Sequence, residues 1–264
     1  MRHWEGTIRR GYALTPHGQV HYREAGAGET LVLLHHSTRS SDVWREVLPC
    51  LAERFHVVAL DTPGFGNSPP PAAPPGLAGY TAAFIEAVEA LGVRRFALFG
   101  FLTGAAFALD LAARFPDRVT RLVLGACPVI DDRAAWLRTA TLTPLEADGS
   151  HLTTVWHGYA DGAYRGWGSL EQVQRATIDS ASAGPVHAHF AHLAVAELDV
   201  KARIPAVAAP TLLVYGVRGP FAARQAEIAP LFRAAERVEV DSGPLIMQER
   251  PYELCRVVTE FLRG

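Results

Sequence analysis

Short runs of apolar residues recur along this chain and alternate with segments whose apolar residues fall at helical spacing. An apolar run of about four to eight residues between turn residues is typical of a buried strand. Apolar residues at every third or fourth position are typical of an amphipathic helix. The expected strands are 7–14, 19–24, 30–35, 55–60, 95–99, 119–125, 211–216 and 238–240. The expected helices are 42–53, 80–91, 107–115, 221–234 and 251–262.

This alternation predicts an α/β protein with a mostly parallel sheet of eight strands flanked by helices. A Pro-His-Gly turn at 16–18 favours an opening hairpin. The alternation stops near Pro128, and residues 128–208 lack an obvious buried strand. We interpret residues 128–208 as an inserted helical cap, and residues 1–127 with 209–264 as the core.

Composition narrows the partners that we expect. The 264 residues are 49% hydrophobic, enough for a packed core, and the formal net charge is −2. That charge argues against a nucleic acid or a polybasic membrane surface, and no apolar run reaches the roughly 18 residues of a membrane span. Cys50, Cys127 and Cys255 are scattered, which fits a reducing compartment better than a disulfide framework. Because no signal-peptide pattern follows Met1, we expect a cytoplasmic protein. We expect its partner to be a small molecule, and the sequence leaves its oligomeric state open.

Segment 95–106 has the most informative pattern in the chain. An apolar run ends at Gly100, a second glycine follows at Gly104, and helical spacing then continues to Pro116. A strand, a sharp turn and a helix in this order are the form of the nucleophile elbow G-x-S-x-G. The glycines matter because Cβ atoms there would collide with neighbouring backbone. Leu102 occupies the apex, and its hydrocarbon side chain has no nucleophilic atom.

With these residues, the chain resembles the α/β-hydrolases that have a helical cap, close to the epoxide hydrolase and haloalkane dehalogenase branch. The resemblance covers nearly the whole sequence and depends on five local signatures in the family's order. They resemble, in turn, the L-L-H-G-x-P loop with its tryptophan, the D-x-P-G-x-G-x-S loop, the elbow, the strand before the acid loop, and the E-R-P after the catalytic histidine. The five signatures are 33–37 with Trp44, 61–68, 100–104, 210–216 and 249–251.

The same resemblance implies that all three positions of the catalytic triad are replaced. In the family the triad runs Ser or Asp, then Asp or Glu, then His. These positions hold Leu102, Gly219 and Pro244, and none of the three side chains has a titratable group. Only weak acceleration survives when a triad is lost. The resemblance therefore argues against ordinary ester, epoxide or haloalkane hydrolysis by this route.

Other residues offer a displaced triad. A shift of one residue places Thr103 at the apex, but Phe101 then stands where the turn needs a small residue. Asp131 and Asp132 follow the next strand, although helix capping is the favoured interpretation for them. Cys127 offers a thiol, but a buried structural cysteine is the commoner case.

The resemblance also implies which residues line the site. Ser37 and Thr103 hold the positions whose backbone N–H groups form the oxyanion hole. His35 matches a histidine that has a structural role in the family. His36 replaces a family glycine, so we expect its imidazole to line the cavity and to be the candidate catalytic group. The full set of expected substrate-binding residues is His35, Ser37, Phe101, Leu102, Thr103, Trp156, Pro244 and Leu245.

We expect neither a metal nor a cofactor. His187, His189 and His192 form a cluster, but only the last two share a helix face. No acid or cysteine stands near them at a familiar ligand spacing. The chain also has no G-x-G-x-x-G or Walker pattern, so no nucleotide cofactor is implied.

Three functions remain open. The first is a cofactor-free, non-hydrolytic enzyme (a cyclase, isomerase or lyase) that acts on an apolar small molecule or natural-product intermediate through shape, oxyanion donors and His36. The second is ligand binding without chemistry, with Leu102 and Pro244 filling the former site. The third is hydrolysis through a displaced triad. We favour the first because the frame of the site is retained around an apolar apex, although fold alone does not determine a reaction.

Overall fold

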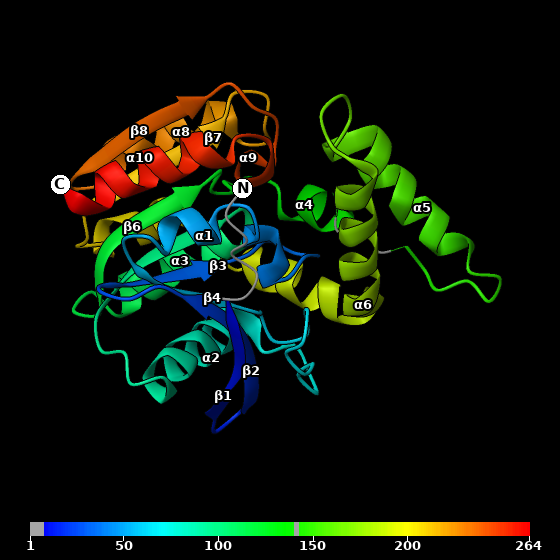
Figure 1. Cartoon of the computed structure of the whole chain (residues 1–264), viewed down its shortest axis with the longest axis horizontal. Helices are drawn as coiled ribbons and strands as arrows, with labels where there is room; N and C mark the ends of the chain where they lie inside the picture. The colour runs from blue at the N-terminus through cyan, green and yellow to red at the C-terminus, as the bar shows by residue number, and fades with distance from the viewer. Residues whose placement is uncertain (1–7, 140–142) are drawn as a thin grey trace.

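The computed structural model describes residues 8–139 and 143–264. The opening residues, where the sequence predicts no signal peptide, lie outside this part. A single eight-stranded sheet with the order β1-β2-β4-β3-β5-β6-β7-β8 forms the centre (Figure 1). β1 and β2 pair antiparallel, as do β2 and β4, and every other neighbouring pair is parallel. The predicted α/β fold with a mostly parallel sheet of eight strands is confirmed.

All eight expected strands are present. They are β1 Arg9–Thr15, β2 Gly18–Ala25, β3 Thr30–Leu34, β4 His56–Leu60, β5 Phe96–Phe101, β6 Val119–Gly125, β7 Thr211–Gly216 and β8 Ala235–Val240. In β3, Leu31 and Leu33 belong to one buried cluster, and Val32 and Leu34 belong to the other. Alternate residues of a strand point to opposite faces, so this strand is buried on both sides, as its unbroken apolar run predicts.

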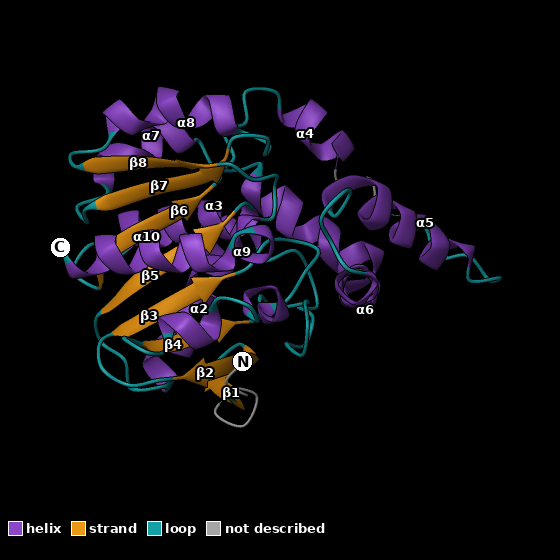
Figure 2. Ribbon diagram, turned by 45° about the horizontal axis from the view of Figure 1, so that its top comes forward, coloured by secondary structure: helices purple, strands orange, loops and turns teal. Residues whose placement is uncertain are grey.

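Helices cover both faces of the sheet, as Figure 2 shows. The α-helices are α1 Leu48–Leu51, α2 Gly76–Ala90, α3 Thr103–Arg114, α4 Arg133–Thr139, α5 Ser150–Gly158, α6 Leu170–Val195, α7 Val200–Arg203, α8 Ala222–Ile228, α9 Ile246–Glu249 and α10 Pro251–Arg263. The shorter helical turns are η2 Ser41–Trp44, η3 Tyr159–Ala163, η4 Ile204–Ala206 and η5 Ala229–Leu231. Phe84 of α2 and Phe107 of α3 fill one cluster, while Leu51 of α1 and Val258 of α10 fill the other. No helix in the described ranges is both long enough and apolar enough to span a membrane.

Helices α4, α5 and α6 lie beyond the carboxyl ends of the parallel strands (Figures 1 and 2). Between β6 and β7, the described residues form no strand. α6 contacts α2 and α3, and Gly184, with a φ of 66°, interrupts it. The three helices therefore lie over the edge formed by the carboxyl ends of the parallel strands, where ligands bind in open α/β sheets. The division into a core and a 128–208 cap stays a prediction.

Prolines account for two errors in the expected helix boundaries. The helix expected at 42–53 is two short pieces, η2 and α1, and Pro49 lies in the first turn of α1. The helix expected at 221–234 ends at Ile228, and Pro230 lies in the turn that follows. Proline has no backbone N–H and crowds the preceding turn, so a helix starts at it more readily than it continues through it.

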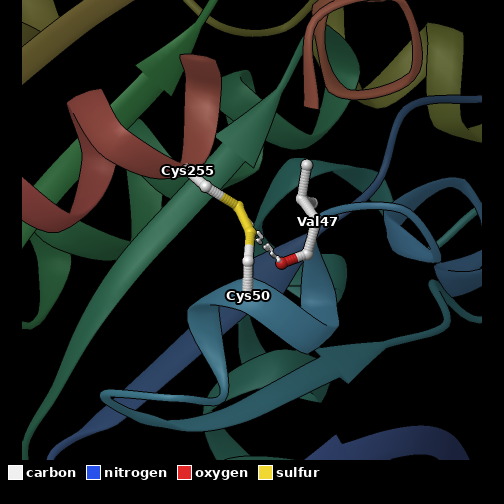
Figure 3. Close-up of a disulfide and its surroundings, with 3 residues drawn as sticks. All are labelled: Val47, Cys50 and Cys255. Carbon is white, nitrogen blue, oxygen red and sulfur yellow. Dashed lines mark hydrogen bonds between the residues drawn. A yellow bond between two sulfur atoms is a disulfide. The ribbon is translucent and has the colours of Figure 1, made fainter. Parts of the chain in front are cut away.

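Cys50 and Cys255 form a disulfide between α1 and α10 (Figure 3). Their Cα atoms are 6.4 Å apart although the residues are 205 positions apart in sequence. Cys127 is buried and unpaired. The expectation that the cysteines are reduced is therefore wrong for two of the three. The cysteines therefore no longer support a reducing compartment. Their spacing along the chain could not predict the pairing, because it does not indicate which helices pack together.

Candidate functional site

The turn between β5 and α3 has the backbone of a nucleophile elbow. Leu102 sits between the strand and the helix with φ 49° and ψ −116°, a conformation rarely adopted by a residue with a Cβ atom. A Cβ atom added to Gly100 would collide with the carbonyl group of Gly104. One added to Gly104 would collide with the backbone of β3 and the residue after it. The prediction that both positions require glycine is confirmed.

Leu102, and not Thr103, occupies the apex of this turn. The Leu102 N–H donates to the Gly125 carbonyl at 2.8 Å, and its carbonyl accepts from Ala105 N–H at 2.8 Å. Thr103 is already the first residue of α3. The alternative with Thr103 at the apex is therefore wrong. The Leu102 side chain is half-buried and packs against the cluster that contains Phe101.

His35 braces the loop that follows β3. The Thr62 backbone N–H donates to His35 Nε2 at 2.9 Å, so the ring proton is on Nδ1, which donates to the His36 carbonyl at 3.0 Å. Burial lowers the pKa of His35 below its usual value. Both ring nitrogens are thus engaged within the protein, an arrangement that suits a bracing role better than contact with a substrate.

His36 is the buried group with a free nitrogen in this loop. Its side chain is 6% exposed, its Nδ1 has no hydrogen-bond partner among the described residues, and its ring meets the edge of Phe101 at 5.8 Å. Burial, followed by the charges of Arg39 and His35, lowers the pKa of His36 well below 6.5. The imidazole is therefore neutral near pH 7. It can exchange a hydrogen bond there, but it is a weak base.

One of the two expected oxyanion donors, the Ser37 N–H, is hydrogen-bonded to the side chain of the other residue, Thr103. The Ser37 backbone N–H donates to Thr103 Oγ1 at 2.7 Å, and Thr103 Oγ1 donates to Ser37 Oγ at 3.2 Å. No hydrogen bond within the described ranges uses the Thr103 N–H. One of the two backbone donors is thus occupied by a side chain, and the other is free.

The hydroxyl of the next residue, Thr38, contacts the helices that lie beyond the sheet. Thr38 Oγ1 lies 2.5 Å from Ser180 Oγ of α6 and 3.3 Å from Tyr159 Oη of η3. Ser37, Thr38 and Tyr159 are all partly exposed. These contacts connect the loop after β3 to η3 and α6. The sequence pattern did not indicate Ser180 as a site residue.

Arg39 is a second group that the sequence analysis missed. Only 1% exposed, it donates from Nε to Asp179 Oδ2 at 3.2 Å and from Nη1 to Tyr164 Oη at 2.9 Å. Asp179 also accepts from the Ser40 N–H at 2.8 Å, and Tyr164 donates to Gln248 Oε1 at 2.5 Å. A buried charge is stable only with such partners. They lie about 125 or more positions away, so the sequence offered no signal beyond one arginine in an otherwise polar loop.

The positions expected for the acid and the histidine are neighbours. Gly219 closes a turn after β7 by donating to the Gly216 carbonyl at 2.9 Å. A Cβ atom at Gly219 would stand 3.5 Å from Pro244 Cα. Pro244 is half-buried, and Leu245 is 3% exposed in the cluster against which Leu102 packs. The fold thus brings these two positions together, and neither has a proton to transfer.

The remaining candidates have structural partners. Cys127 is completely buried, and burial raises the pKa of its thiol to about 12, so it is no thiolate nucleophile near neutral pH. Asp131 pairs with Arg224 at 2.6 Å, and Asp132 accepts from the Ala135 N–H at 2.9 Å. The capping interpretation of Asp132 is confirmed.

Trp156 and the histidine cluster occupy different parts of the helices beyond the sheet. Trp156 is half-buried and packs against the same cluster as Leu102. The His192 carbonyl accepts from Trp136 Nε1 at 3.0 Å, and the His187 ring meets Phe190 edge-on at 5.7 Å. Within the described residues, no group of three or more His, Cys, Asp or Glu side chains could hold a metal ion.

Five surface pockets of the described chain lie away from the elbow. Neither Leu102, His36 nor Pro244 belongs to the wall of any of the five. The expected cavity above Leu102 is thus not one of them.

Known proteins share this architecture. The family model described as alpha/beta hydrolase fold matches residues 29–251. An uncharacterised hydrolase of Saccharomyces cerevisiae is 36% identical over 114 residues, which are 40% of this chain and 37% of that protein. The chain matches less than half the length of this relative and of the other curated relatives compared.

Two solved structures show how closely the backbone follows the family. A hydrolase from Pseudomonas aeruginosa superposes with a TM-score of 0.85 and 24% identity, over 97% of this chain and 99% of that one. Epoxide hydrolase A from Mycobacterium thermoresistibile superposes with a TM-score of 0.83 and 19% identity, over 98% and 99% of the two chains. At such low identity, the similarity establishes the fold and not the reaction.

Proposed function

This chain belongs to the alpha/beta hydrolase fold family, and on that premise we propose that it is a cofactor-free, non-hydrolytic enzyme acting on an apolar small molecule or natural-product intermediate. The reaction would be a cyclisation, an isomerisation or an elimination. The observation that carries the proposal is Leu102 at the apex of the elbow, held in the backbone conformation of a nucleophile without being one. Such strain costs about 1–3 kcal/mol and persists where the surrounding structure over-determines it.

The groups around Leu102 can position a substrate without attacking it. Ser37, Thr38 and Tyr159 are partly exposed residues with hydroxyl groups, and the Thr103 N–H offers one backbone donor. A carbonyl oxygen at that donor would be polarised, as in an oxyanion hole. His36 is neutral, so it would exchange hydrogen bonds with a substrate rather than abstract a strongly held proton. These roles suit reactions governed by orientation.

Mass spectrometry distinguishes this proposal from hydrolysis. Apolar polyketide-like and terpenoid-like carbonyl compounds are incubated with the protein, and the molecular masses of the products are measured. A cyclised or isomerised product has the mass of its substrate, an elimination product weighs less, and a hydrolysis product has gained one water. Leu102→Phe, which adds bulk at the apex, should abolish turnover, whereas Thr177→Val, in a buried position on α6, should not. Products that have gained water would overturn the proposal.

Ligand binding without chemistry is a second candidate, and one observation favours it. Because Thr103 Oγ1 already accepts from the Ser37 N–H, half of the expected oxyanion hole is occupied. A binding protein would then raise its melting temperature with a ligand of this class and release it unchanged. Thermal shift without any product, across the same compounds, would support binding over catalysis.

Hydrolysis through a displaced triad has weaker support at the elbow, although relatives are named as hydrolases. A hydroxyl–imidazole–carboxylate row does occur elsewhere: Thr30 Oγ1 lies 3.3 Å from His56 Nδ1, and His56 Nε2 lies 3.0 Å from Glu24 Oε2. Thr30 and His56 begin β3 and β4, at the amino ends of these strands. Ester hydrolysis that is lost in His56→Gln but kept in Thr103→Val would assign the activity to this row.

A further inference from the structure

A cavity of about 690 Å³ opens at the amino ends of the parallel strands. Its wall includes Thr30 of β3, Phe96 and Ala97 of β5, and Arg263 at the end of α10. Figure 1 shows that end of α10 on the opposite side of the sheet from α4, α5 and α6. The cavity is therefore separate from the elbow. Its volume is within the range of roughly 300–1,000 Å³ typical of small-molecule sites.

Four arginines converge on this cavity from four segments of the chain: Arg54, Arg95, Arg121 and Arg263. One carboxylate, that of Glu29, shares the wall, which leaves a surplus of three positive charges. The chain as a whole has a formal net charge of −2, so this concentration is not a reflection of composition. Charges of one sign around a concave surface focus the field there and attract an oppositely charged ligand.

None of the four guanidinium groups forms an ion pair or a hydrogen bond with another described residue. By contrast, Arg256 on the outer side of α10 pairs with Glu260 at 2.9 Å. Arg121 lies over the Phe261 ring, with 5.5 Å from Cζ to the ring centroid. That stacking holds a guanidinium by its face and leaves its N–H groups for a ligand.

One part of the cavity wall, called the floor here, is formed by apolar side chains. Phe55 and Phe96 are 5% and 1% exposed, and both belong to the wall together with buried Leu262. A ligand that fills this space would set anionic groups against the arginine rim and a hydrophobic portion against the floor. A free inorganic anion would satisfy only the rim.

We propose that this cavity binds a small molecule with two or more phosphate groups beside an apolar ring or chain. Planar guanidinium groups bind phosphate oxygens in pairs, which gives Arg an advantage over Lys at such a site. The proposal is independent of the chemistry at the elbow, because no residue is shared between the two sites.

Calorimetric titration at about 0.15 M salt tests the proposal with three probes: tripolyphosphate, ATP and adenosine. ATP should bind more tightly than tripolyphosphate because it adds a ring for the floor, and adenosine should bind too weakly to detect. In Arg54→Gln/Arg95→Gln, binding of ATP and tripolyphosphate should weaken by roughly tenfold or more, since each charge-assisted hydrogen bond lost costs at least about 1.5 kcal/mol. Arg256→Gln removes an equivalent charge from α10 outside the cavity and should change neither affinity.

Several results would overturn the proposal. One is that the wild type binds neither ATP nor tripolyphosphate at this salt concentration. Another is that Arg54→Gln/Arg95→Gln binds them as tightly as the wild type does. A third is that Arg256→Gln weakens binding as much as the double variant does. Tighter binding of tripolyphosphate than of ATP would contradict the role of the apolar floor. The exposed arginine variants should retain the wild-type melting temperature, so a loss of binding reports the site and not the fold.

Discussion

The Ser37 backbone N–H and the Thr103 hydroxyl are hydrogen-bonded at 2.7 Å, across the gap between the loop after β3 and the first residue of α3. In the family resemblance, these two residues supply the oxyanion donors. Here the Thr103 hydroxyl accepts the hydrogen bond of the Ser37 N–H, so this donor is already used. Any oxyanion that binds at the elbow must either displace this hydroxyl or rely on the Thr103 N–H alone.

Replacing Thr103 with valine should test the strength of this contact. Thr103→Val keeps the shape and removes the acceptor, so a partly buried N–H loses its partner and stability should fall by about 0.5–1.5 kcal/mol. Urea denaturation measures the change. Thr177→Val is the control, because its hydroxyl donates only to the carbonyl one turn earlier in α6 and a smaller loss is expected. An unchanged midpoint for Thr103→Val would mean that water replaces the hydroxyl without loss.

Replacing Leu102 tests the assignment of the three triad positions. Leu102→Ser installs a hydroxyl at the apex but no base, because Gly219 and Pro244 stand where the acid and the histidine are expected. Release of p-nitrophenol from short esters should therefore stay at the wild-type background. The triple variant with Gly219→Asp and Pro244→His should exceed the single variant by roughly tenfold or more. Full activity from Leu102→Ser alone would show that a base lies elsewhere.

Gly104 should be the least replaceable residue of the elbow. An alanine there drives its Cβ atom into the backbone of Leu34 and His35, so α3 must move away from β3. We expect a loss of about 1–3 kcal/mol in the free energy of unfolding. Gly158→Ala is the matched control, because no atom lies within 4 Å of its Cβ position at the end of α5. There, alanine should stabilise by up to about 1 kcal/mol.

Acid stability should depend on Asp61, which is 1% exposed after β4. Burial by itself raises the pKa of this carboxyl group, but hydrogen bonds from His21 and from the backbone N–H groups of Asn67 and Ser41 outweigh burial and lower the pKa to about 2. The unfolded chain has the higher pKa, near 3.8, and so takes up the proton first. Stability contributed by Asp61 is therefore present above about pH 4 and lost as the pH falls toward 2, by about 2 kcal/mol.

Urea midpoints of the wild type and of Asp61→Asn between pH 2 and about 7 check this expectation. The variant should be less stable than the wild type at neutral pH, and the difference should shrink as the pH falls. Asp117→Asn, at an exposed position, should retain the acid dependence of the wild type. A difference that stays constant across the range would rule out titration of Asp61 as the cause.

The Cys50–Cys255 disulfide should be detectable by mass spectrometry of the intact protein. The intact protein, isolated without reductant, should weigh two hydrogens less than the reduced chain. Cys255→Ser should lower stability by about 2–5 kcal/mol because the crosslink closes a long loop. The reduced wild type should show a similar loss, because it lacks the same crosslink. Cys127→Ser is the control for mass, since that residue is unpaired. A wild-type mass equal to that of the reduced chain would show both thiols to be free.

The sequence was informative wherever local periodicity or a backbone requirement decides structure. Apolar runs located the buried strands, and the Pro-His-Gly turn located the opening hairpin. Two glycines located the elbow, because only glycine permits the close approach of α3 to β3 and β5 there. The boundaries of short helices were less predictable. Pro49 lies in the first turn of a new helix, α1, where the apolar pattern favoured continuing one helix.

The fold and the identity of the residue at the apex of the elbow could thus be predicted from the order of residues alone. Both follow from short-range sterics and from the burial of alternating apolar positions. Three contacts became known only from the folded chain: Thr103 accepts from the Ser37 N–H, Arg39 pairs with Asp179 of α6, and Cys50 is bonded to Cys255. The folded chain also showed that four arginines surround one cavity. Such contacts join segments far apart in the chain, and no local pattern encodes which of them will be neighbours.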